Sequence, residues 1–256
     1  MPITSTGVLG ADIISALLTG TMLLLALNTA TVETAIALLE RNAKKTTALY
    51  SQSWASNFNE AEKLQPQLDK IMKILAKKKA VLEGIFVVAG PGSFTGLRIG
   101  VTTANILGAA AGAPLYACDT FSFLRARVPE KLRDATAILL RAGGDFCAIM
   151  IPVAKQGTSP VHQIVSINDL PSIIIKNTKI KYVLADLRAE ELKKYQLPQK
   201  IKWLPKTKLL TFSEAVGDTI KTALKKSLKP SPLIVPIYLQ PPKITMPGIS
   251  AIPGIT

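Results

Sequence analysis

The sequence of 256 residues predicts an α/β protein built from two related halves. Apolar runs of strand length alternate along the chain with segments of helical periodicity, which is typical of α/β proteins. Residues 137–151 repeat the strand, tight turn and strand pattern of residues 23–39, which suggests a duplicated α/β unit. Apolar residues make up 48% of the chain and aromatic residues 5%, so we expect a large core of Ala, Leu, Ile and Val.

The first half is predicted to open with antiparallel strands. The apolar runs Leu23–Leu27 and Thr34–Leu39 flank a tight turn at Asn28–Thr31. Lys45–Ser51 is expected to add a third strand. A buried strand is predicted later, at Gly84–Ala89, from a continuous apolar run.

A long amphipathic helix is predicted over Glu60–Leu75. Its apolar residues recur at helical spacing on one face: Leu64, Leu68, Ile71, Met72 and Leu75. Pro66 either starts the main part of this helix or kinks it.

A glycine-rich turn at residues 90–96 precedes a second helix, over residues 95–112, with Ser93 or Thr95 as its N-cap. Small residues recur on this helix at every fourth position: Gly96, Gly100, Ala104, Gly108 and Gly112. Glycine inside a helix costs about 1 kcal/mol relative to alanine, so close packing must compensate. The stripe packs either on the protein's own sheet or on a helix of a partner, and both interpretations stay open.

The second half is predicted from weaker patterns. We expect a strand at Leu115–Cys118, a helix from Thr120, strands at Ala137–Leu140, Phe146–Ile151 and Lys181–Ala185, and an amphipathic helix at Phe212–Leu228 capped by Ser213 or Thr211. The predicted domains are 22–118 and 119–229, with an extended proline-rich tail at 230–256.

The first 27 residues do not indicate a membrane or secretory segment. The apolar stretch Gly7–Leu27 is interrupted by five polar or glycine positions, and no Lys or Arg precedes it. Residues 1–21 are interpreted as an extension, or as an upstream start with Met22 as the native one. Cys118 and Cys147 make no disulfide framework, which favours a reduced, cytoplasmic location.

The charge of the chain is strongly basic, with a formal net charge of +14. Between Lys176 and Lys229 there are 14 Lys and Arg against 5 Asp and Glu. Such an excess favours an anionic partner, such as nucleic acid or an acidic protein, or else forms a solvated lysine-rich surface.

No catalytic or metal-binding set is apparent. His162 is the one histidine, so a site with two histidine ligands is excluded within the chain, and no GxSxG elbow accompanies it. The glycine-rich turn lacks the Gly-Lys-Ser/Thr ending of a Walker A loop. A helix N-terminus can still bind anions, so Gly92, Ser93, Thr95 and Arg98 are candidates for contact with an anion or nucleotide. The Arg98 guanidinium is expected either to bind a carboxylate or to be solvated.

The segment Gly90–Gly100, GPGSFTGLRIG, resembles the signature of the TsaB (YeaZ) family. Leu25–Thr31 resembles that family's first strand and turn, Leu64–Pro66 the end of its first long helix motif, and Pro236–Gln240 its C-terminal segment. The resemblance is dense from Met22 to about Phe123 and thin beyond.

The resemblance implies an actin-like ATPase (ASKHA, RNase H-like) fold with a degenerate second half. It implies a non-catalytic scaffold subunit of the complex that makes N6-threonylcarbamoyladenosine at adenosine 37 of tRNA. The chain would be a paralogue of the catalytic subunit TsaD that pairs with TsaD and, in the complex, with the ATPase TsaE. We expect no tightly bound cofactor, with ATP or ADP possible in the complex. Contact with tRNA is either indirect or made directly by the basic region Lys176–Lys229. Without the partner, the apolar faces of the helices should favour a homodimer.

We expect the interface with TsaD on the two helices of the first half, at Leu64, Leu68, Ile71, Met72, Leu75, Gly96, Gly100 and Ala104. The chain departs from the family at Asn28, where Asp is common, at Glu60, where His is common, at Arg141–Asp145 and at Gln240. These departures weaken a ligand-binding role. The alternative is a glycoprotease-like peptidase or a nucleotide-dependent enzyme of the same fold.

Overall fold

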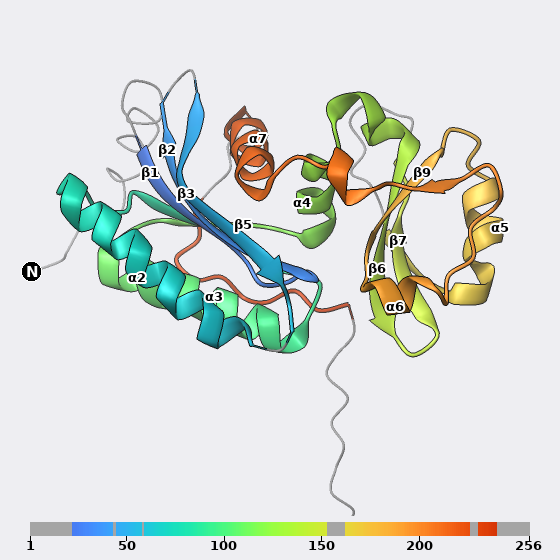
Figure 1. Cartoon of the computed structure of the whole chain (residues 1–256), viewed down its shortest axis with the longest axis horizontal. Helices are drawn as coiled ribbons and strands as arrows, with labels where there is room; N and C mark the ends of the chain where they lie inside the picture. Colours follow the sequence, from blue (N-terminus) through green and yellow to red (C-terminus); the bar gives the residue numbers. More distant parts are fainter. Residues whose placement is uncertain (1–21, 43–44, 58, 153–161, 226–229, 240–256) are drawn as a thin grey trace, which may run out of the picture.

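The computed structural model describes residues 22–42, 45–57, 59–152, 162–225 and 230–239. Figure 1 shows two β-sheets, one in each half of the molecule, with helices against them. The predicted extension at 1–21, the end of the tail at 240–256 and the last residues of the helix predicted to reach Leu228 lie outside the described residues.

The first sheet has five strands in the order β3-β2-β1-β4-β5. Strands β1 and β2 pair antiparallel, as do β2 and β3, whereas β4 and β5 run parallel to β1. The elements of this half are β1 (Met22–Asn28), β2 (Glu33–Arg41), β3 (Thr46–Ala55), α2 (Glu60–Lys78), β4 (Gly84–Val88), α3 (Phe94–Ala111) and β5 (Leu115–Cys118).

The second sheet repeats this arrangement. Its strand order is β8-β7-β6-β9-β10. Strand β7 pairs antiparallel with both β6 and β8, whereas β9 and β10 run parallel to β6. Its elements are α4 (Thr120–Arg127), β6 (Thr136–Gly143), β7 (Phe146–Met150), β8 (His162–Ser166), α5 (Leu170–Ile175), β9 (Tyr182–Asp186), α6 (Ala189–Leu192), β10 (Lys202–Trp203) and α7 (Phe212–Lys225). The shared order confirms two related halves with the actin-like, RNase H-like arrangement.

The second half is the reduced copy. In the first half, α2 has 19 residues and α3 has 18 residues, and they connect β3 to β4 and β4 to β5. The corresponding helices of the second half, α5 and α6, have 6 and 4 residues. Its last strand, β10, has two residues. The expectation of a degenerate second half is therefore confirmed.

The apolar core forms layers on both faces of the first sheet. Leu25, Ile36 and Ile85 pack with α2 and α3 on one face. Leu24 and Phe86 belong to the cluster on the other face, which includes side chains of α4, α7 and the second sheet. A third cluster lies between the second sheet and its short helices.

Helix α7 crosses the boundary that the sequence predicted between domains. The first sheet ends at Cys118, the last residue of the predicted first domain. Helix α7 nevertheless packs against β2, β3 and α4, and Gly217 lies against Thr46. The boundary at residues 118 and 119 therefore stays a prediction.

The N-caps of α3 and α7 are residues that the sequence predicts as caps. The Ser93 side chain accepts a hydrogen bond from the Gly96 N–H and caps α3. Thr211 and Glu214 exchange hydrogen bonds at the start of α7, as in a capping box. Pro66 lies inside α2, which begins at Glu60 as predicted.

Candidate functional site

The turn after β1 is organised by the side chain of Asn28, which is 1% exposed. Its Nδ2 donates to Thr31 Oγ1 at 2.7 Å and to the Glu33 carbonyl at 3.0 Å, and its Oδ1 accepts from the Ala30 N–H at 3.1 Å. The amide thus bonds only to its own turn. A carboxylate has no donor for the Glu33 carbonyl, so Asn and Asp are not interchangeable here.

The glycine-rich loop is held against this turn. The Ser93 N–H donates to the Ala30 carbonyl at 2.8 Å, and Thr29 Oγ1 donates to the Gly96 carbonyl at 2.6 Å. A Cβ atom on Gly92 would overlap the Ala30 carbonyl. The Ser93 N–H is therefore used inside the protein, and so is the Gly96 N–H, which donates to Ser93 Oγ. Fewer N–H donors are left for a phosphate.

A cavity of about 460 Å³ lies between the two sheets, where this turn and loop face the second half. Of the four predicted anion contacts, Gly92, Ser93 and Thr95 line it and Arg98 does not. Its other lining residues are Ala30, Thr31, Val32, Ser56, Phe94, Leu140, Arg141, Ala142, Gly143, Asp186, Arg188, Glu191, Tyr238 and Leu239.

The charged residues of this cavity bind one another. Arg141 and Glu191 form an ion pair at 2.9 Å, and Glu191 also accepts from the Arg188 N–H at 3.0 Å. Arg188 Nη2 donates to the Ser56 carbonyl at 3.3 Å, which ties the two halves together.

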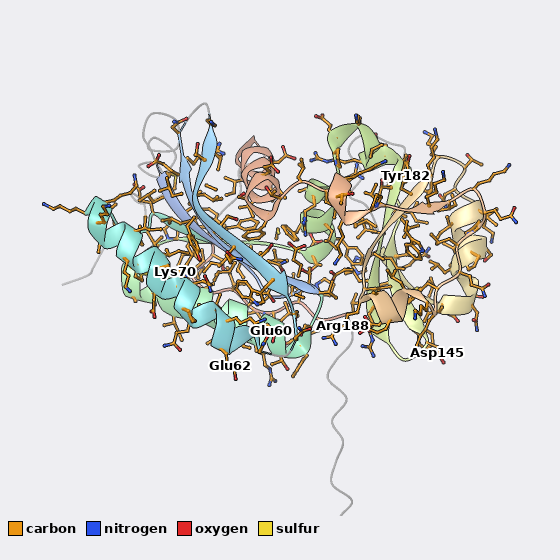
Figure 2. All side chains as sticks on the ribbon, in the orientation of Figure 1. Glu60, Glu62, Lys70, Asp145, Tyr182 and Arg188 are labelled. Carbon is orange, nitrogen blue, oxygen red and sulfur yellow. The ribbon has the colours of Figure 1, made fainter. Side chains whose placement is uncertain are left out.

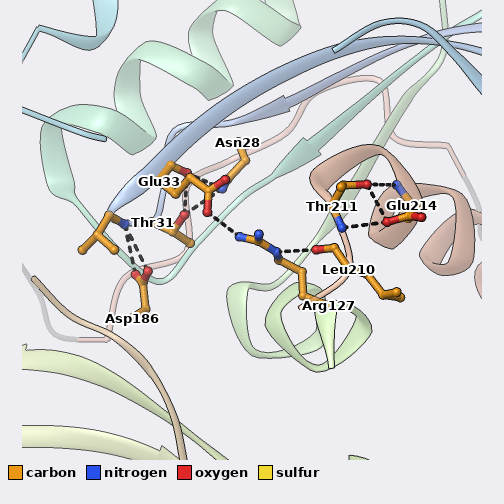
Figure 3. A network of polar contacts seen from close by, with 9 residues as sticks. Asn28, Thr31, Glu33, Arg127, Asp186, Leu210, Thr211 and Glu214 are labelled. Atoms are coloured by element: carbon orange, nitrogen blue, oxygen red, sulfur yellow. Dashed lines mark hydrogen bonds and ion pairs between the residues drawn. The ribbon is translucent and has the colours of Figure 1, made fainter. Parts of the chain in front are cut away.

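Asp186 links the halves directly, as Figure 3 shows. Both carboxylate oxygens accept from the Val32 N–H, at 3.1 and 3.3 Å. Burial raises the pKa of Asp186 to about 7, against the lowering effects of this hydrogen bond and of Lys206 and Arg127. Burial therefore favours the protonated form of this carboxyl group.

Arg127 provides a second link beside it (Figure 3). Its guanidinium pairs with Glu33 at 2.8 Å and donates to the Leu210 carbonyl at 3.1 Å. Burial alone would raise the pKa of Glu33, but the hydrogen bond and charge of Arg127 outweigh it, and the pKa is lowered.

Sequence reasoning missed Asp186, Arg188 and Glu191. Asp186 directly follows the strand predicted at Lys181–Ala185. Ligands of open α/β sheets bind at the carboxyl ends of parallel strands, so the position of Asp186 was an available signal. Arg188 and Glu191 lie in and beside a four-residue helix, which is too short for a periodic pattern.

Most of the predicted interface residues are buried inside the monomer, and the interface predicted at these residues stays a prediction. Six of the eight are buried inside the monomer: Leu64, Ile71, Leu75, Gly96, Gly100 and Ala104. A Cβ atom on Gly100 would overlap the Thr29 hydroxyl, and one on Gly108 would crowd the Leu115 side chain. The small-residue stripe therefore brings α3 close to the first turn and to β5.

The outer faces of α2 and α3 remain accessible. Leu68 is half-buried and Met72 is 37% exposed, one helical turn further along α2. On α3, Ile99 is half-buried and Ile106 is 62% exposed, two turns apart on the same face. Figure 1 shows the two helices side by side on one face of the first sheet.

Arg98 and His162 both lie against aromatic rings. The Arg98 guanidinium sits 4.1 Å from the centre of the Phe94 ring, which in turn contacts Tyr238. Arg98 is exposed, and its contact is with a ring rather than with a carboxylate. His162 is exposed and stacks on Phe121 at 4.9 Å.

Among the described residues, no group of three His, Cys, Asp or Glu side chains is placed to hold a metal ion. Burial raises the pKa of Cys118 well above its ordinary value and that of Cys147 to about 11. No helix among the residues that the structure describes is long and apolar enough to cross a membrane.

Comparison with solved structures decides the fold. YeaZ from Pseudomonas aeruginosa superimposes with a TM-score of 0.62 at 17% identity, over 85% of this chain and 100% of that one. A second structure, of a protein similar to peptidase YeaZ from Pseudomonas aeruginosa, matches equally, over 86% of this chain and 100% of that one. The chain has the YeaZ fold. The resemblance noted in Gly90–Gly100 is confirmed at this level.

Sequence comparison gives a related result. Residues 56–150 match the family model of TsaD, tRNA N6-adenosine threonylcarbamoyltransferase. The enzyme of that name from Erythrobacter litoralis is 30% identical over 93 residues, 36% of this chain and 27% of that protein. The one from Rhizobium etli is 28% identical over 148 residues, 51% of this chain and 40% of that protein. The chain spans less than half the length of these two relatives.

Proposed function

We propose that this chain is a scaffold subunit for threonylcarbamoylation of tRNA adenosine, without catalytic residues of its own. The YeaZ fold and the TsaD match over residues 56–150 support a role in this modification. The matched segment contains α2 and α3, the helices whose outer faces are accessible.

The proposal of a non-catalytic role rests on the hydrogen bonds of the Asn28 side chain. Its amide bonds to the turn that faces the cavity, and the neighbouring glycine-rich loop donates to the same turn. These groups hold the architecture of a nucleotide-binding fold without being directed at a ligand. ATP or ADP in the complex remains part of the proposal only as a ligand of the assembly.

We place the contact with a TsaD-like catalytic subunit on the outer faces of α2 and α3. Leu68, Met72 and Ile106 supply accessible apolar surface there, in place of the buried residues first expected. Apolar side chains at the centre of an interface contribute roughly 1.5–3 kcal/mol each when fully buried. A homodimer through the same faces, and recruitment of a TsaE-like ATPase, belong to this proposal.

Co-purification with the TsaD-like protein of the same organism tests the placement. The double variant Met72→Asp/Ile106→Asp should fold normally and lose the partner. Ile175→Asp is the matched control, because Ile175 is 61% exposed on α5 of the second half. Full recovery of the partner with the double variant would show that the helices do not form the interface.

The enzyme alternative has a separate test. The cavity between the sheets would hold the substrate, and Ser93 and Thr95 are hydroxyl-bearing residues that line it. ATP hydrolysis or peptide cleavage by the purified chain that disappears in Ser93→Ala would favour an enzyme over a scaffold.

A further inference from the structure

The second sheet has an edge at which three parallel strands begin. Strands β6, β9 and β10 run parallel, so the segments that lead into them meet on one side of the sheet. The Lys181 N–H donates to the Ala135 carbonyl at 2.9 Å, and the Lys202 N–H donates to the Lys181 carbonyl at 3.0 Å. Residues far apart in the sequence are thereby neighbours at this edge.

Lysines gather at this edge. The segments 176–182 and 199–203 contain no Asp or Glu. We call their exposed lysines the basic edge: Lys176, Lys179, Lys181, Lys200 and Lys202. Within the described parts of the chain, none of them has an ion-pair partner.

The acidic residues near the basic edge do not neutralise it. On the approach to β6, Asp134 is paired with Arg125 at 2.9 Å, and Glu130 is exposed on the same short helix as Lys131. The edge therefore keeps a positive field toward solvent.

The other acidic side chains of this sheet lie at the opposite edge. They follow the carboxyl ends of β6, β8 and β9: Asp145, Asp169, Asp186, Glu190 and Glu191. In Figure 2, Tyr182 marks the beginning of β9, and Asp145 lies at the far end of the sheet. These acidic groups thus lie away from the basic edge, together with Arg141 and Arg188.

The chemistry of the basic edge fits a phosphate backbone. Lysine ammonium groups bind phosphates as point charges, without reading bases. The aromatic residues beside the edge, Tyr182 and Trp203, are half-buried, so they offer no open ring for stacking on single-stranded bases. A structured RNA, which presents phosphates rather than splayed bases, suits such a surface better.

We propose that the basic edge binds the phosphate backbone of the tRNA, so that this chain touches the substrate RNA itself. The identity of the RNA rests on the proposed function; the preference for a structured phosphate backbone rests on the charge and geometry of the edge. This favours the direct contact over the indirect one, and narrows it within Lys176–Lys229 to the basic edge.

Binding of the full chain to a fluorescent, unmodified tRNA transcript tests the proposal, with anisotropy measured between 50 and 200 mM KCl. The double variant Lys181→Glu/Lys202→Glu should bind about tenfold more weakly, and the slope of log affinity against log salt should fall by about 2, since each lost lysine–phosphate contact removes about one unit. Lys193→Glu/Lys194→Glu is the matched control, with the same charge change on exposed lysines at the end of α6. The control should lose less than threefold.

Several results would overturn the proposal. Equal losses in both double variants would mean that only net charge matters, and an unchanged affinity would mean that the lysines are solvated. Retained tRNA binding with lost binding to phosphatidylserine vesicles would assign the edge to a membrane surface. Thermal unfolding verifies that the variants fold, and Lys181→Gln/Lys202→Gln serves if the Glu variant does not.

Co-purification of the TsaD-like partner, run in parallel, separates this proposal from the proposed function. The basic-edge variant should retain the partner and lose tRNA affinity, and the helix variant should do the reverse. If the wild-type chain never retains the partner but its tRNA affinity depends on the edge, the proposed function fails and the RNA contact stands.

Discussion

At the scale of single residues, the side-chain amide of Asn28 organises the turn after β1. The family resemblance places Asp where this chain has Asn28, and the amide makes three hydrogen bonds within its turn. An amide both donates and accepts, so it satisfies a hydroxyl, a carbonyl and an N–H at once.

We therefore predict that Asn28→Asp destabilises the fold instead of restoring a site. A carboxylate cannot donate to the Glu33 carbonyl, and a buried polar group without its partner costs about 1–3 kcal/mol. Urea unfolding at pH 7 should show a loss of that size. Asn168→Asp, on an exposed asparagine, should change stability little. Equal stability of Asn28→Asp and wild type would contradict the structural role.

Asp186 leads to a prediction about pH. An unfolded aspartate titrates near 3.9, whereas burial raises the pKa of Asp186 to about 7. Between these values the folded state keeps a proton that the unfolded state has lost, so stability falls as pH rises from about 4 to 7 and stays lowered above.

The variant Asp186→Asn should remove this fall, because its amide oxygen still accepts from the Val32 N–H without carrying charge. At pH 8 it should be more stable than wild type by roughly 2–4 kcal/mol, since one pKa unit corresponds to about 1.36 kcal/mol. Denaturant unfolding from pH 4 to 8 measures this. Parallel curves for the variant and wild type would refute the assignment, and Asp169→Asn is the exposed control.

At the scale of elements, the sequence predicted most of the first half. The strands β1, β2 and β4 were placed to within a few residues from apolar runs, and the helices α2 and α3 from long segments of helical spacing. Strand β8 was missed because it begins with the polar residues His162 and Gln163, and helices α5 and α6 because six and four residues are too few to show a helical period.

Periodicity did not reveal what each helix face packs against. Leu64, Ile71 and Leu75 form an apolar face whether the sheet or a partner covers it. That face packs on the monomer's own sheet, and the small-residue stripe of α3 packs on the first turn and on β5. The accessible residues Met72 and Ile106 could not be separated from the buried ones by pattern alone.

Helix α3 supplies a prediction at this scale. Gly100→Ala should destabilise the monomer by about 1–3 kcal/mol, because overpacking a close contact displaces its neighbours, and the added Cβ would overlap the Thr29 hydroxyl that bonds the Gly96 carbonyl. Ala110→Leu, on the exposed side of the same helix, is the control. Thermal unfolding compares the two variants. A Gly100→Ala protein as stable as wild type would favour the other interpretation, in which the small-residue stripe packs on a helix of a partner.

At the scale of the whole molecule, the two halves are joined by polar groups around one cavity. Asp186, Arg127 and Arg188 each bond from the second half or α4 to the first half. The repeated strand order was predictable from the echo of residues 23–39 in 137–151, but these long-range pairs were not, since their partners are up to 154 residues apart.

Reconstituted threonylcarbamoylation of tRNA by the TsaD-like subunit tests the scaffold role most directly. Wild-type chain and the cavity variant Ser93→Ala/Arg141→Ala should stimulate the reaction equally, and Met72→Asp/Ile106→Asp should not stimulate it. Loss of stimulation in the cavity variant, with full stimulation by the helix variant, would contradict a scaffold that acts through the outer faces of α2 and α3.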